Sequence, residues 1–98
     1  IFSPILTRLD IKSLIRIKIN LYTRTSTLEV HPSHVDEEYP HTGAIFYLNT
    51  NDGKTILEDG TKVDSVANRV LLFDASTKHS STSTTDSKAR LNININYQ

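Results

Sequence analysis

Residues 90–97 read Arg-Leu-Asn-Ile-Asn-Ile-Asn-Tyr, a strict alternation of polar and apolar side chains. Because successive side chains of a strand point to opposite faces of a sheet, this segment predicts a strand with one apolar and one polar face. The polar face, an arginine and three asparagines, is either a solvated surface or the lining of a wet cavity, since buried amides need hydrogen-bond partners. The choice between these environments decides where a ligand would bind.

The same period of two recurs along most of the chain. Residues 14–22 alternate Ile and Leu with Arg, Lys, Asn and Tyr, which predicts a second two-faced strand. Asn51-Asp52-Gly53 and Asp59-Gly60 predict hairpin turns, so most neighbouring strands should be antiparallel. Further extended segments are expected at residues 27–35, 44–49, 54–58, 62–66, 69–74 and 79–84.

Eight short antiparallel strands predict a mainly all-β fold, a double-stranded β-helix or jelly roll in which two sheets pack face to face. Ser3-Pro4 predicts the start of one short N-terminal helix that ends near Asp10. At 98 residues the chain has room for a single domain, residues 1–98. It begins with Ile1 and contains no methionine, so we expect an N-terminally truncated fragment or a processed product.

Composition restricts the classes of function. Eleven Lys and Arg residues balance eleven Asp and Glu residues, so no net field favours nucleic acid or an anionic membrane. The absence of cysteine excludes disulfides and thiolate metal sites. No apolar run approaches the ~20 residues of a membrane span, and the N-terminus lacks a signal-peptide pattern. We therefore expect a soluble, cytoplasmic protein.

Three side chains predict a metal site. His34 and Asp36 are two residues apart, so on an extended segment they point to the same side and can bind one cation together. His79, from a distant strand, would complete two imidazoles and one carboxylate, a set that leaves positions on Fe(II) open for a co-substrate and dioxygen. A His and an Asp at this spacing also occur by chance in surface loops, and His31 and His41 remain alternative ligands.

A cationic residue after the last histidine adds a second element to this site. Arg90 carries a fixed, always-charged fork that can bind the far carboxylate of a dicarboxylic acid whose other end chelates the metal. Lys88 is the competing anion anchor, but it follows Asp86-Ser87 in a turn-like stretch. We therefore favour Arg90.

Five segments together resemble the Fe(II)- and 2-oxoglutarate-dependent dioxygenases, in particular their prolyl 4-hydroxylase-like branch, which includes phage and marine microbial sequences. Their order and spacing agree with that family over roughly residues 14–97. The segments are His34-Val35-Asp36, Gly43-Ala44-Ile45-Phe46-Tyr47-Leu48-Asn49, Asn68-Arg69-Val70-Leu71-Leu72-Phe73-Asp74, His79, and Arg90-Leu91-Asn92-Ile93-Asn94.

The resemblance implies a role for five residues. His34, Asp36 and His79 would bind iron, while Arg90 and Tyr47 would bind the distal carboxylate of 2-oxoglutarate. It also implies oxidative decarboxylation of 2-oxoglutarate to succinate and CO2, coupled to hydroxylation of an unactivated C–H bond, and suggests ascorbate as a reductant. The branch suggests a prolyl residue as substrate, but relatives oxidise other peptides, nucleobases and small molecules.

Polar residues of the first and last strands are candidates for substrate contact, or else belong to a solvated outer surface; they are Asn20, Tyr22, Asn92, Asn94 and Asn96. Glu37, Glu38 and Asp52 are compatible with a basic substrate or with an ordinary solvated loop. Two other classes remain open: a non-catalytic jelly-roll binding module, and a structural or capsid-associated β-sandwich. Neither of them predicts the metal triad together with an anchoring arginine.

Apolar side chains on the outer strand faces predict a homodimer, because one short helix would cover less apolar surface than they present. Alternatively, the helix and the loop at Val63 to Val66 cover them. The side chains are Ile17, Ile19, Phe46, Leu48, Leu71 and Phe73. Light scattering at micromolar concentration tests the dimer, and a particle of 11.0 kDa would contradict it.

Overall fold

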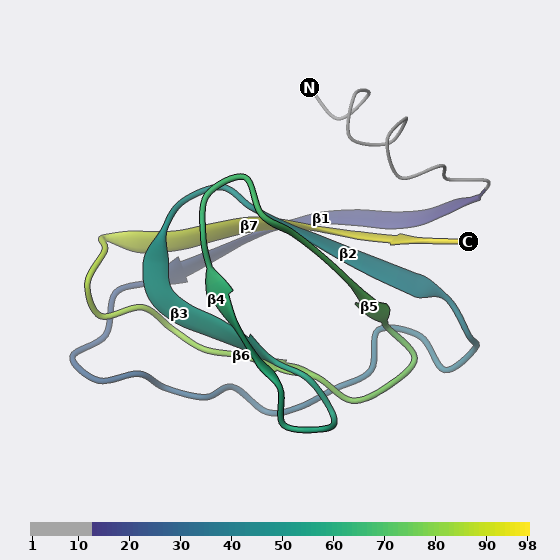
Figure 1. Ribbon diagram of the computed structural model, residues 1–98, viewed down its shortest axis with the longest axis horizontal. Coiled ribbons are helices and arrows are strands. Elements are labelled where there is room, and N and C mark those ends of the chain that lie inside the picture. The colour runs from purple at the N-terminus through teal and green to yellow at the C-terminus, as the bar shows by residue number, and fades with distance from the viewer. Residues whose placement is uncertain (1–12) are drawn as a thin grey trace.

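The computed structural model describes residues 13–98, which form seven strands in two antiparallel sheets. One sheet has the order β1-β7-β2-β5 and the other β4-β3-β6. The two sheets lie over one another as in a jelly roll (Figure 1). Within these residues no helix is long and apolar enough to cross a membrane. The strands are β1 (Leu14–Thr23), β2 (Thr42–Tyr47), β3 (Asn51–Ile56), β4 (Lys62–Ser65), β5 (Val70–Asp74), β6 (Ser80–Ser81) and β7 (Ala89–Tyr97).

The expectation of eight strands is wrong, because residues 27–35 form no regular strand. This segment touches the smaller sheet only through isolated bridges, from Val30 to Thr82 and from His34 to His79. The chain advances three residues from His31 to His34 while its partner advances two from Ser81 to His79, so the register shifts between the two bridges. The expected helix from Ser3 to Asp10 lies outside the described residues.

The strand expected at residues 79–84 is also shorter, since β6 has two residues. Side-chain hydroxyls take the place of backbone acceptors along the rest of the segment. The Lys54 N–H donates to Thr82 Oγ1 over 2.8 Å, and the Glu29 N–H donates to Ser83 Oγ over 2.9 Å. These side-chain bonds occupy backbone donors that a regular ladder would pair with carbonyl oxygens.

One of the two expected turns is wrong. Asn51-Asp52-Gly53 begins β3, and its register against β4 shifts between Asn51 and Lys54, which indicates a bulge. The chain passes from the larger to the smaller sheet just before this point, at residues 48–50. Asp59-Gly60 does connect β3 to β4, and Gly60 has a φ of 89°, where the lack of a Cβ removes the steric penalty.

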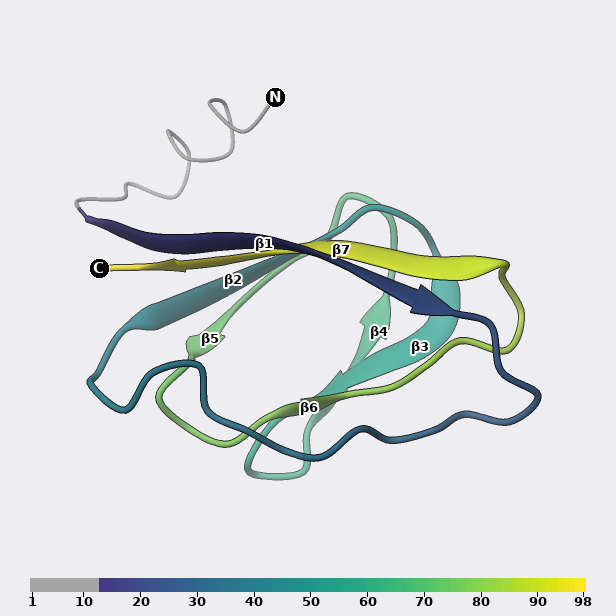
Figure 2. The ribbon, with the colours of Figure 1, turned by 180° about the vertical axis from the view of Figure 1, so that it is seen from behind.

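The position of β7 decides between the two environments open to its polar face. It lies between β1 and β2, and Figure 2 shows it alongside β1. Asn92 and Asn94 on its polar face line a cavity between the sheets. The opposite face supplies Ile93 and Ile95 to an apolar cluster with Ala44. The polar cross-strand pairs with β1 are Arg16–Asn96, Lys18–Asn94, Asn20–Asn92 and Tyr22–Arg90.

The expected outward orientation of Leu71 and Phe73 is wrong. These residues pair with Ile45 and Gly43 and share the inner face of the sheet with Ile45, which lines the cavity. A run of apolar residues has no alternation from which a face could be inferred. The homodimer stays a prediction, and the exposed large apolar side chains of this sheet are Leu14, Ile19, Leu21, Val70 and Leu72.

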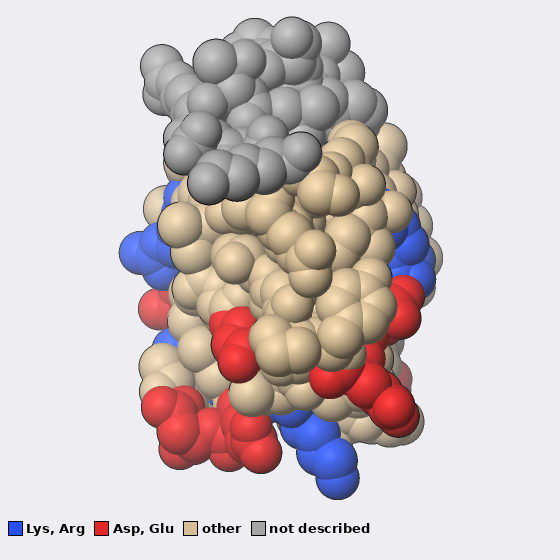
Figure 3. All heavy atoms as spheres, turned by 90° about the vertical axis from the view of Figure 1, so that its right-hand side faces the viewer, with Lys and Arg blue, Asp and Glu red and all other residues tan. Residues whose placement is uncertain are grey.

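Charged side chains are scattered rather than concentrated at the end of the molecule drawn in Figure 3. Lys and Arg lie at its two sides and at its lower edge, and Asp and Glu lie in separate groups on its lower half. Uncharged residues make up most of the surface between them. This view therefore contains no continuous basic surface on the described residues.

Gly43→Ala is expected to destabilise the fold by about 1–3 kcal/mol through overpacking. A Cβ at Gly43 would lie 2.7 Å from Cζ of Phe73 and 2.9 Å from Cβ of Ala75. Urea unfolding measures the cost. The same substitution is also made in a Phe73→Leu protein, where the smaller side chain should reduce the loss of unfolding free energy. An equal loss in both proteins would rule out the clash with Phe73 as the cause.

Candidate metal centre

A pair of backbone hydrogen bonds holds His34 beside His79. The N–H of each residue donates to the carbonyl oxygen of the other, and both bonds measure 2.9 Å. Directly opposed residues of an antiparallel pair project their side chains to the same side. The two imidazole ring centres consequently lie 4.6 Å apart.

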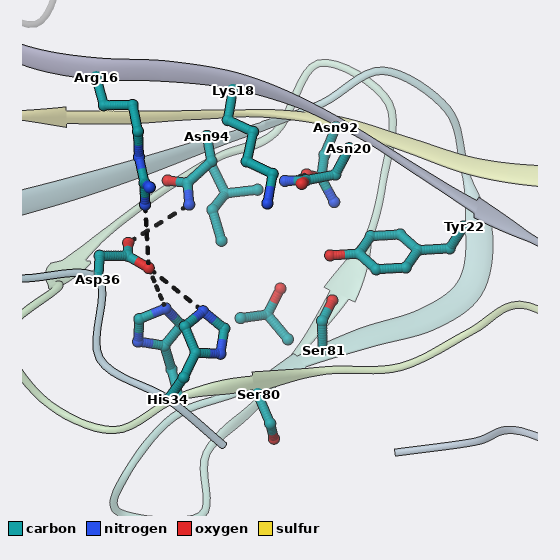
Figure 4. A pocket seen from close by; sticks show the side chains of 13 residues that line it. Arg16, Lys18, Asn20, Tyr22, His34, Asp36, Ser80, Ser81, Asn92 and Asn94 are labelled. Atoms are coloured by element: carbon teal, nitrogen blue, oxygen red, sulfur yellow. Dashed lines mark hydrogen bonds and ion pairs between the residues drawn. The ribbon is translucent and has the colours of Figure 1, made fainter. Parts of the chain in front are cut away.

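Asp36 joins the two histidines because the pairing continues past His34. Its N–H donates to the carbonyl of Ala75 over 3.1 Å, which turns its carboxylate toward both rings, as Figure 4 shows. Asp36 Oδ1 lies 3.3 Å from Nε2 of His34 and 3.3 Å from Nε2 of His79. Two ligands about 2.1 Å from one ion at right angles are about 3 Å apart, so the spacing suits one cation.

The hydrogen bonds of His79 leave one ring nitrogen free. Nδ1 lies 3.0 Å from the carbonyl oxygen of Thr77, which can only accept, so Nδ1 carries the proton. Nε2 is buried and has no hydrogen-bond partner among the described residues. An imidazole held by its Nδ1–H to a carbonyl, with a bare Nε2, is the arrangement of a metal-bound histidine. The donor set therefore fits a divalent cation.

The charges around Asp36 favour its ionised form. Burial alone would raise the pKa of this carboxyl, but His79, Asn94 and His34 outweigh burial and lower the pKa below its usual value. For His79, burial would lower the pKa, but Asp36 and the Thr77 carbonyl outweigh burial and raise it. Asp36 and His79 thus stabilise each other's charged form.

The cluster lies at one side of a cavity of about 90 Å³ between the sheets. Four of the five predicted substrate residues line this cavity, namely Asn20, Tyr22, Asn92 and Asn94, whereas Asn96 does not. Asn20 Nδ2 donates to Asn92 Oδ1 over 3.0 Å. Arg16 and Lys18 also line it; neither was predicted from the sequence, although both share the strand parity of Asn20 and Tyr22.

Arg90 is completely buried behind the cavity. Its Nε donates to Ser65 Oγ over 3.0 Å and its Nη2 to Thr55 Oγ1 over 3.3 Å, while Nη1 donates to Ser81 Oγ and the Thr82 carbonyl. Among residues 13–98 no carboxylate lies within ion-pair distance of it. Neutral oxygens and two aromatic rings therefore surround the guanidinium, whose Cζ lies 4.9 Å from the ring centre of Tyr22 and 6.0 Å from that of Tyr47.

Tyr47, on β2, lies beside Arg90 behind the cavity. It is fully buried, and its hydroxyl shares a hydrogen bond of 2.7 Å with Thr55 Oγ1. Burial raises the pKa of Tyr47, so the hydroxyl keeps its proton at neutral pH. Thr55 lines the cavity and contacts both Tyr47 and Arg90, which places both residues one side chain behind the cavity surface.

Gly53 makes room for Arg90. A Cβ there would lie 2.3 Å from Cδ and 2.7 Å from Nε of Arg90. This contact was not predicted from the sequence, because the turn-like triplet Asn51-Asp52-Gly53 gave no sign of a buried neighbour. A glycine inside a strand that has a bulge was the only available signal.

The alternative metal ligands, His31 and His41, and the alternative anion anchor, Lys88, lie outside the cluster. His31 stacks on Tyr22 with ring centres 5.3 Å apart, and Nδ1 of His41 bonds to the carbonyl of Tyr39 over 2.9 Å. Neither belongs to the cluster of possible metal ligands. Lys88 is exposed. The remaining candidates, Glu37, Glu38 and Asp52, do not line the cavity.

No family model and no curated protein matches this chain. An RmlC-like cupin protein from Desulfovibrio desulfuricans superposes with a TM-score of 0.54 at 15% identity, over 84% of this chain and 82% of the cupin. A Pseudomonas putida prolyl-4-hydroxylase superposes with a TM-score of 0.58 at 18% identity, over 98% of this chain and 59% of the hydroxylase. The chain has a cupin-type jelly-roll fold. It spans less than two thirds of the hydroxylase.

His79→Ala and Asp36→Ala are expected to abolish binding of Mn(II), measured by isothermal titration calorimetry, because each removes one of three clustered ligands. His31→Ala is the matched control and should bind the ion as the unmodified protein does. Loss of binding in the control, or its retention in both ligand variants, would move the metal site away from this cluster.

Proposed function

We propose that this chain is an Fe(II)- and 2-oxoglutarate-dependent dioxygenase domain that hydroxylates an unactivated C–H bond. The observation that carries the proposal is a single cavity with two complementary features. A His-Asp-His cluster with a bare buried Nε2 lies at its surface, and a buried arginine without a carboxylate partner lies behind it. A dicarboxylic acid that chelates a metal ion is complementary to both.

The burial of Arg90 supports an anionic ligand. Burying a charge is costly unless it is paired, and here hydroxyl and carbonyl oxygens provide only partial compensation. The far carboxylate of 2-oxoglutarate would supply the missing charge. Thr55 stands between Arg90 and the cavity, so its hydroxyl would either rotate aside or become a third donor to that carboxylate.

Tyr47 would act as a neutral donor in the same subsite. Its hydroxyl keeps its proton, as the raised pKa shows, and it already meets the Arg90 network at Thr55 Oγ1. A phenol and a guanidinium that converge on one carboxylate form charge-assisted bonds of the strong class. We therefore assign Arg90 and Tyr47 to 2-oxoglutarate.

The metal ligands are His34, Asp36 and His79 in this proposal. Bound Fe(II) with 2-oxoglutarate would supply the oxidising chemistry, with succinate and CO2 as products and ascorbate as a candidate reductant. The protein fixes the orientation of the ligands: the Thr77 carbonyl holds Nδ1 of His79, and Asn94 Nδ2 donates to Asp36 Oδ2 over 3.4 Å. These contacts leave Nε2 and Oδ1 free for the ion.

The first substrate to test is a prolyl residue in a peptide, because one structural neighbour is a prolyl-4-hydroxylase by name. Asn20, Tyr22, Asn92 and Asn94 line the cavity and are the proposed substrate contacts. Mass spectrometry of candidate peptides and small molecules incubated with Fe(II), ascorbate and 2-oxoglutarate would identify a hydroxylated product.

A non-catalytic binding or structural module is the second candidate. It is favoured by the hydrogen bonds of Arg90, whose three nitrogens all have partners inside the protein. Anaerobic titration separates the two candidates, because an iron–2-oxoglutarate chelate has a weak visible absorption band. The dioxygenase should show this band and a module without a metal should not.

Arg90→Ala is expected to weaken 2-oxoglutarate binding by about 2–5 kcal/mol, the cost of losing a charge-assisted pair, while Fe(II) binding persists. The anaerobic absorption titration measures the first affinity and calorimetry the second. Lys88→Ala is the control and should change neither. A large effect of Lys88→Ala would move the anchor to that residue, and equal loss of both affinities in Arg90→Ala would indicate unfolding.

Gly53→Ala offers an independent test of the anchor without removing its charge. The added methyl group would displace the Arg90 side chain, so 2-oxoglutarate should bind at least about tenfold more weakly, as expected when one charged hydrogen bond is lost. Metal affinity should not change. Unaltered 2-oxoglutarate affinity in a folded Gly53→Ala variant would argue against Arg90 as the anchor.

A further inference from the structure

Two cationic side chains of β1 face the cavity of a protein that carries no net charge. Figure 4 shows Arg16 and Lys18 extending from the strand toward the space beside the metal cluster. Arg16 Nη2 lies 3.9 Å from Asp36 Oδ1, and its side chain is 47% exposed. Lys18 has no carboxylate within ion-pair distance among the described residues. Lys18 therefore has no acidic partner, and Arg16 has one distant partner and guanidinium N–H groups left over for a ligand.

In the proposed complex no negative charge is left over to balance Arg16 and Lys18. A divalent ion and Arg90 together carry as much positive charge as Asp36 and the two carboxylates of 2-oxoglutarate carry negative charge. Arg16 and Lys18 then remain as excess cations at the cavity. A metal ion on Asp36 would also weaken the contact of Arg16 with that carboxylate, because two cations would compete for it.

The size of the cavity indicates where a substrate would meet these cations. Its volume of about 90 Å³ is small beside the roughly 300–1,000 Å³ of sites that enclose a drug-sized ligand. A co-substrate would occupy most of it, so a substrate approaches at the rim. Arg16 and Lys18 are both exposed, as residues at a rim must be.

We propose that the substrate carries a carboxylate or phosphate group, and that Lys18 and Arg16 bind this group at the rim beside the metal cluster. The inference rests on the proposed function and names the substrate class of the same site. Lys18 supplies a mobile ammonium, and Arg16 supplies a planar fork that binds two oxygens at once. Glu37, Glu38 and Asp52 do not line the cavity, and none of them lies within ion-pair distance of Arg16 or Lys18.

The test uses the zinc-loaded protein saturated with 2-oxoglutarate, because zinc has no redox chemistry and keeps the complex intact. Benzoate, phenyl phosphate and the neutral benzamide are titrated while amide resonances are followed by NMR. An anion should shift the resonances of residues 16–20 saturably, and benzamide should not. The tighter of the two anions identifies whether a carboxylate or a phosphate is the better fit.

Lys18→Gln and Arg16→Gln should each weaken binding of the preferred anion about tenfold, which is the loss of one charged hydrogen bond. Lys62→Gln, an exposed lysine of β4 outside the cavity, is the matched control and should bind as the unmodified protein does. The same spectra report whether each variant is folded. Affinity for 2-oxoglutarate should be unchanged in all three variants.

Three results would overturn the anion site: no saturable shift with either anion, binding of benzamide as tight as that of benzoate, or equal anion affinity in all variants. If Lys18→Gln weakens 2-oxoglutarate binding as much as Arg90→Ala does, Lys18 belongs to the co-substrate subsite instead. If zinc and 2-oxoglutarate themselves shift no resonance, the proposed function fails and this inference fails with it. Failure of the anion site alone leaves the dioxygenase proposal intact.

Discussion

The reciprocal backbone bonds between His34 and His79 are the constraint on which the candidate site depends. Each is 2.9 Å long, and together they form an isolated bridge between an irregular segment and the end of a sheet. Pairing at this one point brings together two imidazoles that are far apart in the sequence. Asp36 follows because its own N–H bonds to Ala75. A slip of one residue would turn a histidine to the other face, and the cluster would be lost.

The larger sheet forms the other wall of the cavity beside the paired histidines. The polar face of β7 lines the cavity between the two sheets, and three of its residues, Arg90, Asn92 and Asn96, are buried. Asn20 and Asn92 satisfy each other across the strands, and Asn94 bonds to Asp36. Arg90, at the far end of the same face, lies among hydroxyls. The alternation that forms the strand thus also supplies the chemistry of the cavity.

Period-two alternation was enough to predict most strands, including β1 and β7, and the spacing of His34, Asp36 and His79 was enough to nominate a cluster. Tertiary context decided the rest. The face occupied by Leu71 and Phe73 could not be read from an uninterrupted apolar run, and a shift in register reduced the strand expected at residues 27–35 to isolated bridges. The oxygens around Arg90 come from Ser65, Ser81, Thr82 and Thr55, which lie in separate segments without a common pattern. Their assembly depends on how the sheets face each other.

The most direct measurement of the central claim is a crystal structure of the protein with Mn(II), with anomalous scattering used to locate the ion. The account predicts one strong peak at roughly 2.0–2.3 Å from Nε2 of His34, Oδ1 of Asp36 and Nε2 of His79, as is usual for nitrogen and oxygen ligands. The bridge between His34 and His79 should be present in the same crystal. A peak bound elsewhere, or His34 and His79 separated by more than about 8 Å, beyond the reach of ligands that share one ion, would contradict it.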